Sequence, residues 1–276
     1  MAIVSVAFIG DIVGGPGRKV LQQQLPRLRE AYAPDLIVVN AENARQGSGL
    51  TPKQYEQILA LGVDGVTLGD HWHRDQSIAT VLQHPESRIA RPANISRRAP
   101  GRGMLRLPPA GDRTKSLYVI PVLGRIFLSL PADDPFATVD RLLETLEERD
   151  PIVLIEAHME ATSEKIALAH HLVGRVTAVV GTHTHVPTAD ARILPGGTAF
   201  ITDLGMTGPY HSVIGRDVRS VVEHMTTGMH RRFDVGEGDE RLCGAVVRYN
   251  ESTTRSLSIT PFQFHADPAE PPFAGP

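Results

Sequence analysis

Side chains that can bind metal ions recur in this sequence directly after short apolar runs. Asp11 follows the apolar run 3–10, Asp70 follows 66–69, and His158 follows 152–157. The candidate ligands and their neighbours are Asp11, Glu42, Asn43, Asp70, His71, His158, His183 and His185. Charged side chains avoid full burial unless they are paired or bind metal. Each residue alone is more often a helix or turn cap, but their recurrence after five such runs predicts a metal site.

The residue types also indicate the chemistry of this site. Mixed imidazole and carboxylate donors suit Fe, Mn or Zn better than Mg or Ca, and they do not choose among those three metals. Glu42 can bridge two cations, and a hydroxide held between the cations is a nucleophile near neutral pH. His71 is placed beside Asp70 to protonate a departing alkoxide as a general acid. We therefore expect a dinuclear phosphoesterase.

The elements that must position these residues alternate along the chain. Apolar runs predict strands at 3–9, 36–39, 65–68, 117–121, 152–155 and 176–180. Helical periodicity predicts helices at 18–32, 52–61, 76–82, 135–149 and 162–173. Thr51 and Asp134 can cap two of these helices, and Gly62 suits a left-handed C-terminal position. Continuous apolar strands between helices predict a sheet covered on both faces, with ligands bound at the carboxyl ends of the strands.

The C-terminal third has a different pattern. Gly196-Gly197 separates the runs 192–194 and 198–202 like a hairpin turn, and alternating runs follow at 244–249 and 256–260. We expect an α/β sandwich whose second sheet closes with antiparallel strands. The stretch 96–115 is typical of a long loop or a small excursion. The chain is predicted to form a single domain over residues 1–265, followed by a loose tail at 266–276.

Composition limits the possible partners. The 276 residues carry a net charge of −3, so no overall basic field would attract duplex DNA or an anionic membrane surface. A small phosphorylated nucleotide fits as a substrate, because a metal centre supplies positive charge locally.

The single cysteine, Cys243, cannot form an intramolecular disulfide, which favours a reducing, cytoplasmic location. The run 3–9 is too short to span a membrane, and a homo-oligomer remains open.

Several longer motifs resemble one family, the YmdB-like branch of the calcineurin-like metallophosphoesterases. The resemblance extends from about Ile3 to Tyr249. The motifs are Gly10-Asp11-Ile12-Val13-Gly14, Asn40-Ala41-Glu42-Asn43, Leu68-Gly69-Asp70-His71, Arg91-Pro92-Ala93-Asn94, His158-x-Glu160-Ala161-Thr162-Ser163-Glu164-Lys165, Gly181-Thr182-His183-Thr184-His185 and Gly205-Met206-Thr207-Gly208-Pro209.

The resemblance implies a four-layer α/β/β/α metallophosphoesterase sandwich with mixed sheets, a di-iron or similar centre, and phosphodiesterase activity toward 2′,3′-cyclic nucleoside monophosphates. It also implies roles for the candidate residues. One ion would be held by Asp11, Asn43 and His185, and the other by Asp70, His158 and His183. Glu42 would bridge the two ions, and His71 would be the proton donor.

Asp70 departs from the pattern of that family, which typically has Asn at this position. Val13 likewise replaces the His of the Asp-x-His motif of the wider superfamily, but this is the family's own variation. A carboxylate at position 70 adds a negative charge to the site, which should tighten metal binding and reduce the Lewis acidity felt by a phosphate. We expect a slower enzyme, or a different preferred metal, than in the Asp70→Asn variant.

Weaker signals concern the substrate and the competing functions. His73 and His211 are near the predicted site loops and could contact substrate, and Tyr210 could stack on a base or pack in the core. The glycine-rich run 14–19 matches neither a phosphate loop nor a dinucleotide fingerprint. The arginines between 97 and 113 could bind a nucleotide or simply be solvated.

The alternatives to a phosphodiesterase are a phosphomonoesterase or RNA-end phosphatase with the same centre, and a weakly active regulatory metal-binding protein.

Overall fold

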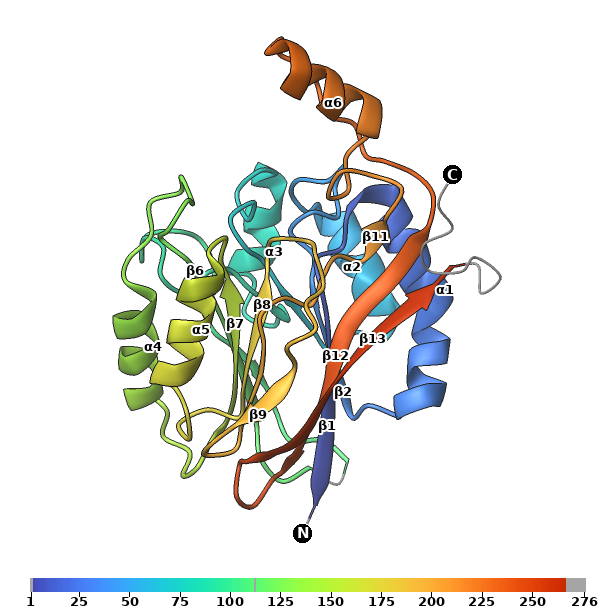
Figure 1. Cartoon of the computed structure of the whole chain (residues 1–276). Coiled ribbons are helices and arrows are strands. Elements are labelled where there is room, and N and C mark those ends of the chain that lie inside the picture. Colours follow the sequence, from blue (N-terminus) through green and yellow to red (C-terminus); the bar gives the residue numbers. More distant parts are fainter. Residues whose placement is uncertain (1, 112, 267–276) are drawn as a thin grey trace.

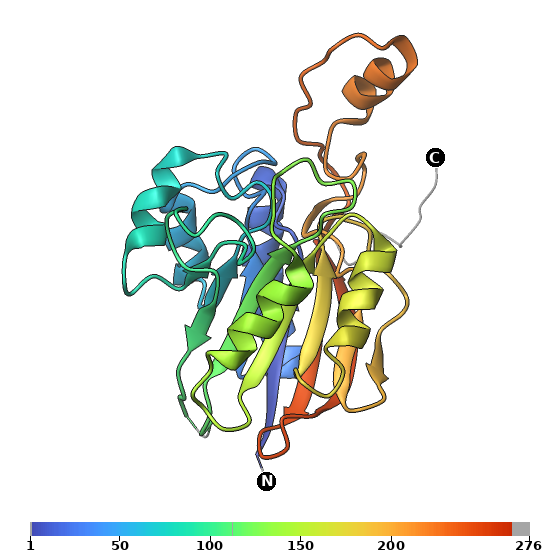
Figure 2. The same cartoon turned by 90° about the vertical axis from the view of Figure 1, so that its left-hand side faces the viewer.

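The protein is a sandwich of two β-sheets with helices on both outer faces (Figures 1 and 2). A computed structural model of the chain describes residues 2–111 and 113–266. The first sheet has the strand order β11-β12-β1-β2-β3-β4, with β13 paired to β12, and the second has the order β5-β6-β7-β8-β10-β9. Both sheets combine parallel and antiparallel pairs. Strands β1, β2 and β3 are parallel to one another, as are β6, β7, β8 and β10.

The strands are β1 (Ile3–Ile9), β2 (Leu36–Asn40), β3 (Gly65–Thr67), β4 (Ile89–Ala90), β5 (Leu105–Leu107), β6 (Leu117–Leu123), β7 (Ile152–His158), β8 (Ala178–Thr182), β9 (Arg192–Leu194), β10 (Thr198–Ile201), β11 (Gly208–Pro209), β12 (Glu240–Asn250) and β13 (Ser256–His265). The helices are α1 (Gly14–Tyr32), α2 (Pro52–Ala60), the 3-10 helix η1 (Gln76–Ile78), α3 (Ala79–Gln83), α4 (Pro135–Glu144), α5 (Thr162–His171) and α6 (Val218–Thr227).

Strand β1 shows why the apolar runs are continuous. Val6 and Phe8 pack in the core between the two sheets, whereas Ala7 and Ile9 pack under the helices of the first sheet. Successive side chains of a strand point to opposite faces, and here both faces are buried. A third core lies between the second sheet and helices α4 and α5. The predicted four-layer α/β/β/α sandwich with mixed sheets is confirmed.

Several predicted helix ends are confirmed, and two differ from the structure by four or more residues. Thr51 and Gln54 form a capping box at the start of α2, and Asp134 caps α4 by accepting from the N–H of Phe136. Helix α1 begins at Gly14 instead of residue 18. Gly17 of this helix serves packing, because a Cβ there would collide with the carbonyl of Thr207. Helix α4 ends at Glu144 instead of residue 149.

The C-terminal hairpin of β12 and β13 belongs to the first sheet. Strand β12 pairs antiparallel with β1, so β12 and β13 extend the first sheet and not the second. The second sheet ends in its own antiparallel pairs, β5 on β6 and β9 on β10. The stretch 96–115 contains β5. The predicted tail, apart from residue 266, lies outside the described residues.

The sequence patterns did not predict β4, β11 or helix α6. Helix α6 belongs to an excursion that projects from the sandwich (Figure 1), and of its residues only Val221 is buried. Within the described ranges no helix is long and apolar enough to cross a membrane.

Candidate metal centre

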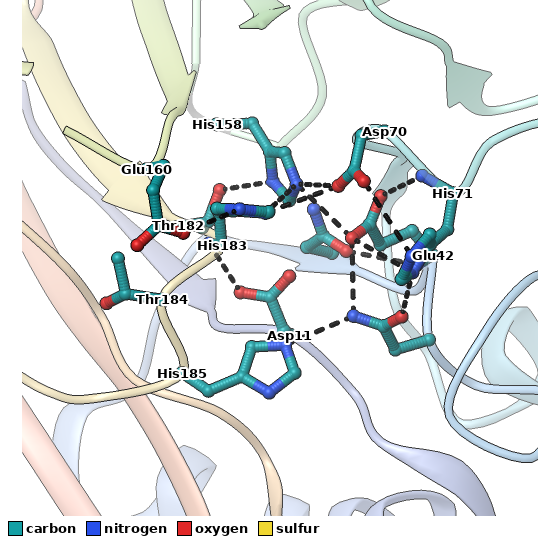
Figure 3. Close-up of polar contacts among 12 residues, drawn as sticks. Asp11, Glu42, Asp70, His71, His158, Glu160, Thr182, His183, Thr184 and His185 are labelled. Carbon is teal, nitrogen blue, oxygen red and sulfur yellow. Dashed lines mark hydrogen bonds and ion pairs between the residues drawn. The ribbon is translucent and has the colours of Figure 1, made fainter. Parts of the chain in front are cut away.

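The candidate metal ligands meet where the parallel strands of both sheets end (Figure 3). Asp11 follows β1, and Asp70 follows β3. Glu42 follows β2, and His158 is the last residue of β7. Gly69 lets the second sheet reach the first, because a Cβ at this position would collide with the imidazole of His158. The predicted convergence of strand ends on one edge therefore describes how these side chains are brought together.

Glu42, Asp70, His158 and His183 form the most compact group. One donor atom from each of the four lies within 4.8 Å of the others. Nε2 of His158 is 3.0 Å from Oδ1 of Asp70 and 3.2 Å from Oε1 of Glu42. Nδ1 of His183 is 3.2 Å from the same oxygen of Asp70. Two carboxylates and two imidazoles that point at one another provide a donor set suited to a transition-metal ion.

Asp11, Asn43 and His185 lie on the other side of this group. Oδ2 of Asp11 accepts from the backbone N–H of His183 at 3.1 Å, and Nδ2 of Asn43 is 3.2 Å from Nε2 of His185. Oδ1 of Asp11 is buried and has no hydrogen-bond partner among the described residues. A buried carboxylate oxygen without a partner is costly in a protein interior, and a cation would satisfy it.

Hydrogen bonds on the far side of the imidazoles direct their lone pairs into the site. The hydroxyl of Thr182 donates to Oε1 of Glu156 at 2.9 Å, so the same hydroxyl can only accept from Nδ1–H of His158, also at 2.9 Å. Nδ1–H of His185 donates to the carbonyl of Ile214 at 2.9 Å. The lone pair of a neutral His158 or His185 is therefore on Nε2, which faces the candidate ligands.

Burial and charge shift the pKa values in the site. Burial alone would lower the pKa of His158, but the carboxylates of Glu42, Asp70 and Asp11 raise it well above its usual value. Burial alone would raise the pKa of Asp70, but hydrogen bonds from His158 and His183 bring it well below its usual value. The pKa of Asp11 is raised, mainly by burial. The carboxylates thus attract positive charge to the position where a metal ion would bind.

His71 lies at the edge of the group. Its backbone N–H donates to Oε2 of Glu42 at 2.9 Å, and its Nδ1 is 2.6 Å from Oδ1 of Asn43. Its Nε2 is 3.7 Å from Oδ2 of Asp70, and the side chain is 25% exposed. The amide oxygen of Asn43 therefore points to His71, and a ligand role for that oxygen needs the amide reversed from this orientation.

The residues proposed to contact substrate lie around this edge of the protein. His73 is exposed, with its ring 5.5 Å from that of Trp72, and His211 is also exposed. The Tyr210 hydroxyl is 3.1 Å from both the carbonyl of Met206 and Sγ of Cys243, and Arg241 lies over its ring. The ring of Tyr210 is thus engaged within the protein, and its contact with a substrate stays a prediction.

The sequence reasoning missed a layer of residues that support the candidate ligands. Oε2 of Glu160 is 3.0 Å from Nε2 of His183, and Oε1 of Glu156 accepts from Nδ2 of Asn40 at 2.7 Å. Burial raises the pKa of Glu156 to about 7. Glu156 could have been found from the sequence, because it is an acidic residue that interrupts the apolar run 152–157.

Comparisons with known proteins identify the family of this chain. The family described as YmdB-like protein matches residues 7–262. A 2′,3′-cyclic-nucleotide 2′-phosphodiesterase from Bacillus subtilis (strain 168) is 42% identical over 255 residues, which cover 92% of this chain and 94% of that protein. A hypothetical protein from Thermus thermophilus has a similar structure, with a TM-score of 0.87 and 42% identity over 95% of this chain and 99% of that one. A novel phosphatase from Mycoplasma pneumoniae has a TM-score of 0.88 and 31% identity over 96% and 94% of the two chains.

Proposed function

Since the chain belongs to the YmdB-like protein family, we propose that it is a two-metal phosphodiesterase that hydrolyses 2′,3′-cyclic nucleoside monophosphates. The observation that carries the proposal is the convergence of Glu42, Asp70, His158 and His183, whose donor atoms lie within 4.8 Å of one another. The phosphodiesterase name of the Bacillus subtilis relative, 42% identical over nearly the whole chain, supports the reaction class and the cyclic nucleotide substrate.

The seven candidate ligands divide into two sets around a shared carboxylate. In this proposal Asp11, Asn43 and His185 would hold one ion, Asp70, His158 and His183 would hold the other, and Glu42 would be shared between them. The unpartnered oxygen of Asp11 and the inward lone pairs of the imidazoles fit such ions. When bound, two ions of Fe, Mn or Zn supply a hydroxide nucleophile near neutral pH and positive charge at the phosphate oxygens.

His71 is proposed to be the proton donor. Opening a 2′,3′-cyclic phosphate releases a ribose alkoxide, which is a poor leaving group unless it is protonated. The backbone N–H of His71 is bonded to Glu42 and its Nδ1 to Asn43, so two candidate ligands fix the direction of the ring. With the amide of Asn43 reversed for its ligand role, Nδ2–H of Asn43 would donate to Nδ1 of His71. Nε2 would then carry the proton that goes to the leaving oxygen.

A substrate panel tests the proposal. The metal-free protein is reloaded with Mn²⁺, Fe²⁺ or Zn²⁺ and assayed with 2′,3′-cyclic AMP, 3′,5′-cyclic AMP, 3′-AMP and an RNA with a 3′-phosphate. The phosphatase described for Mycoplasma pneumoniae is the reason to include the monoesters. We expect 2′,3′-cyclic AMP to be hydrolysed fastest. A preference for the monoesters would replace the proposal with a phosphatase that has the same centre.

The His71→Ala variant tests the proton donor. General acid catalysis contributes about 10²- to 10⁴-fold, so we expect kcat for 2′,3′-cyclic AMP to fall by that factor. His170→Ala is the matched control, because His170 is an exposed histidine on α5. The catalytic proposal fails if His71→Ala retains full activity, or if the wild-type protein is inactive with all three metals.

A further inference from the structure

Lys165 and Asp203 form an ion pair inside the protein, away from the candidate ligands themselves. Lys165 lies on α5 and Asp203 follows β10, and Nζ and Oδ2 are 2.7 Å apart. The side chains are 0% and 1% exposed. A buried ion pair often stabilises a fold no more than apolar residues of the same size would. Its presence here therefore needs a reason other than stability.

The pair is bonded to the backbone on both sides of His183. Nζ of Lys165 donates to the carbonyl of Thr182 at 2.7 Å. Oδ2 of Asp203 accepts from the backbone N–H of Thr184 at 3.1 Å and from its hydroxyl at 2.8 Å. The backbone N–H of His183 itself donates to Asp11. The peptide groups before and after His183 are thus both held by this one buried pair.

The segment held in this way has a strained backbone. His183 has a φ of 92° and His185 a φ of 67°, both in the left-handed region that non-glycine residues rarely adopt. Such a conformation is strained for a residue other than glycine and persists only where the surroundings impose it. Gly181 lies directly before this segment, and a Cβ there would collide with the carbonyl of Thr202 and would lie 3.0 Å from Cδ of Lys165. Without the pair, the backbone around His183 would lose the hydrogen bonds at Thr182 and Thr184 that hold it in this conformation.

We propose that Lys165 and Asp203 are positioning residues that hold His183 and His185 in the conformation required for metal binding. His183 contributes to the compact group with Asp70, and His185 lies beside Asn43 on the other side of the site. The pair therefore supports one candidate ligand of each ion. This inference rests on the proposed metal centre, and it predicts that the loss of the pair weakens the binding of both ions.

Three variants separate positioning from simple stabilisation. Lys165→Met keeps most of the stem and removes the ammonium group that bonds to Thr182 and Asp203. Asp203→Asn keeps an oxygen that can accept from Thr184 and removes the charge. The double variant K165M/D203N leaves no unpaired buried charge, so it should recover much of the Tm lost in Lys165→Met. The carbonyl of Thr182 still lacks its donor in the double variant, so metal affinity should not recover.

Glu251→Gln is the matched control. Glu251 is a buried carboxylate that accepts from the backbone N–H groups of Thr114 and Lys115, both at 2.8 Å. It lies at the opposite end of the sheet, because the adjacent Asn250 pairs with Ile3 at the start of β1, whereas Asp11 follows the end of that strand. This substitution should lower the Tm without changing metal affinity.

The experiment measures Mn²⁺ binding to each metal-free protein by equilibrium dialysis, at a temperature where circular dichroism shows that the variant is folded. We expect Lys165→Met and the double variant to bind Mn²⁺ about 10- to 100-fold more weakly than the wild type, which is the usual effect of losing a group that supports a ligand. The inference is wrong if both bind Mn²⁺ within twofold of the wild type, or if Glu251→Gln weakens binding equally. A wild-type protein that binds no Mn²⁺ would instead overturn the metal centre itself.

Discussion

Replacing Thr182 with Val should separate the support of a metal ligand from the stability of the fold. The two side chains have nearly the same shape, so the substitution removes little except the hydroxyl. That hydroxyl is fully buried and lies between Nδ1 of His158 and Oε1 of Glu156, at 2.9 Å from each. It is the group that determines which nitrogen of His158 carries the proton.

The expected magnitude follows from the lost hydrogen bonds. Each of the two contributes about 1 kcal/mol net, and a buried Nδ1–H of His158 left without an acceptor costs about 1–3 kcal/mol. We therefore expect the free energy of unfolding of Thr182→Val to fall by about 2–4 kcal/mol, since these terms overlap. Metal affinity should fall about 10- to 100-fold, because the ring of His158 is no longer fixed in direction or tautomer.

Thr198→Val is a close control on the neighbouring strand β10. The hydroxyl of Thr198 is also fully buried and makes two hydrogen bonds, donating to the carbonyl of Val176 at 2.7 Å and accepting from the N–H of Gly174 at 2.9 Å. Urea unfolding measures stability, and competition with a fluorescent chelator measures metal affinity. Both variants should lose stability, but only Thr182→Val should lose metal. Equal metal affinities in the two variants would refute the reasoning.

Three further changes have defined outcomes. Asp70→Asn removes a negative charge from the site. The variant should still bind two ions, but its kcat should rise or its preferred metal should change. A variant that binds no metal, or one with the same rates and metal preference as the wild type, would contradict this prediction. Glu160→Gln removes the charged partner of Nε2 of His183. Because Glu160 is 48% exposed, we expect metal affinity, measured by dialysis, to fall only about tenfold. An unchanged affinity would contradict this prediction. Burial alone would raise the pKa of Glu251, but hydrogen bonds from Lys115 and Thr114 bring it below its usual value. Its contribution to stability is therefore present at neutral pH and lost as the pH falls through the acidic range, so the wild type and Glu251→Gln should differ in urea unfolding at about pH 7 and converge near about pH 3.

The strand ends are the part of the site that the sequence could predict. Each apolar run ends at a polar residue, and the carboxyl ends of parallel strands share an edge, so Asp11, Asp70 and His158 could be brought together without coordinates. The Thr51 cap of α2 is likewise a local signal that survives in the structure. These inferences depend on neighbours in sequence, or on a rule that holds for most sheets of this kind.

What the sequence could not predict depends on contacts between distant segments. The pairing of β12 with β1 joins segments from opposite ends of the chain, which no local pattern encodes, so the sequence did not assign the C-terminal hairpin to the first sheet. From the sequence alone, Lys165 would be expected on the surface of its helix. The structure shows instead that it is buried beside Asp203. Helix α6 is different, because Asp217 at its N-cap and Gly228 at its C-cap are local signals that the sequence reasoning overlooked. Its Val222 and Met225 are exposed.

The central claim is that two metal ions bound at Glu42 and its neighbours carry out the hydrolysis. The most direct measurement titrates the metal-free protein with Mn²⁺ and follows the rate of 2′,3′-cyclic AMP hydrolysis against the number of ions bound per chain. We predict that the rate rises until two ions are bound and then stays constant. A rate that reaches its maximum at one ion, or no hydrolysis at any loading, would contradict the claim.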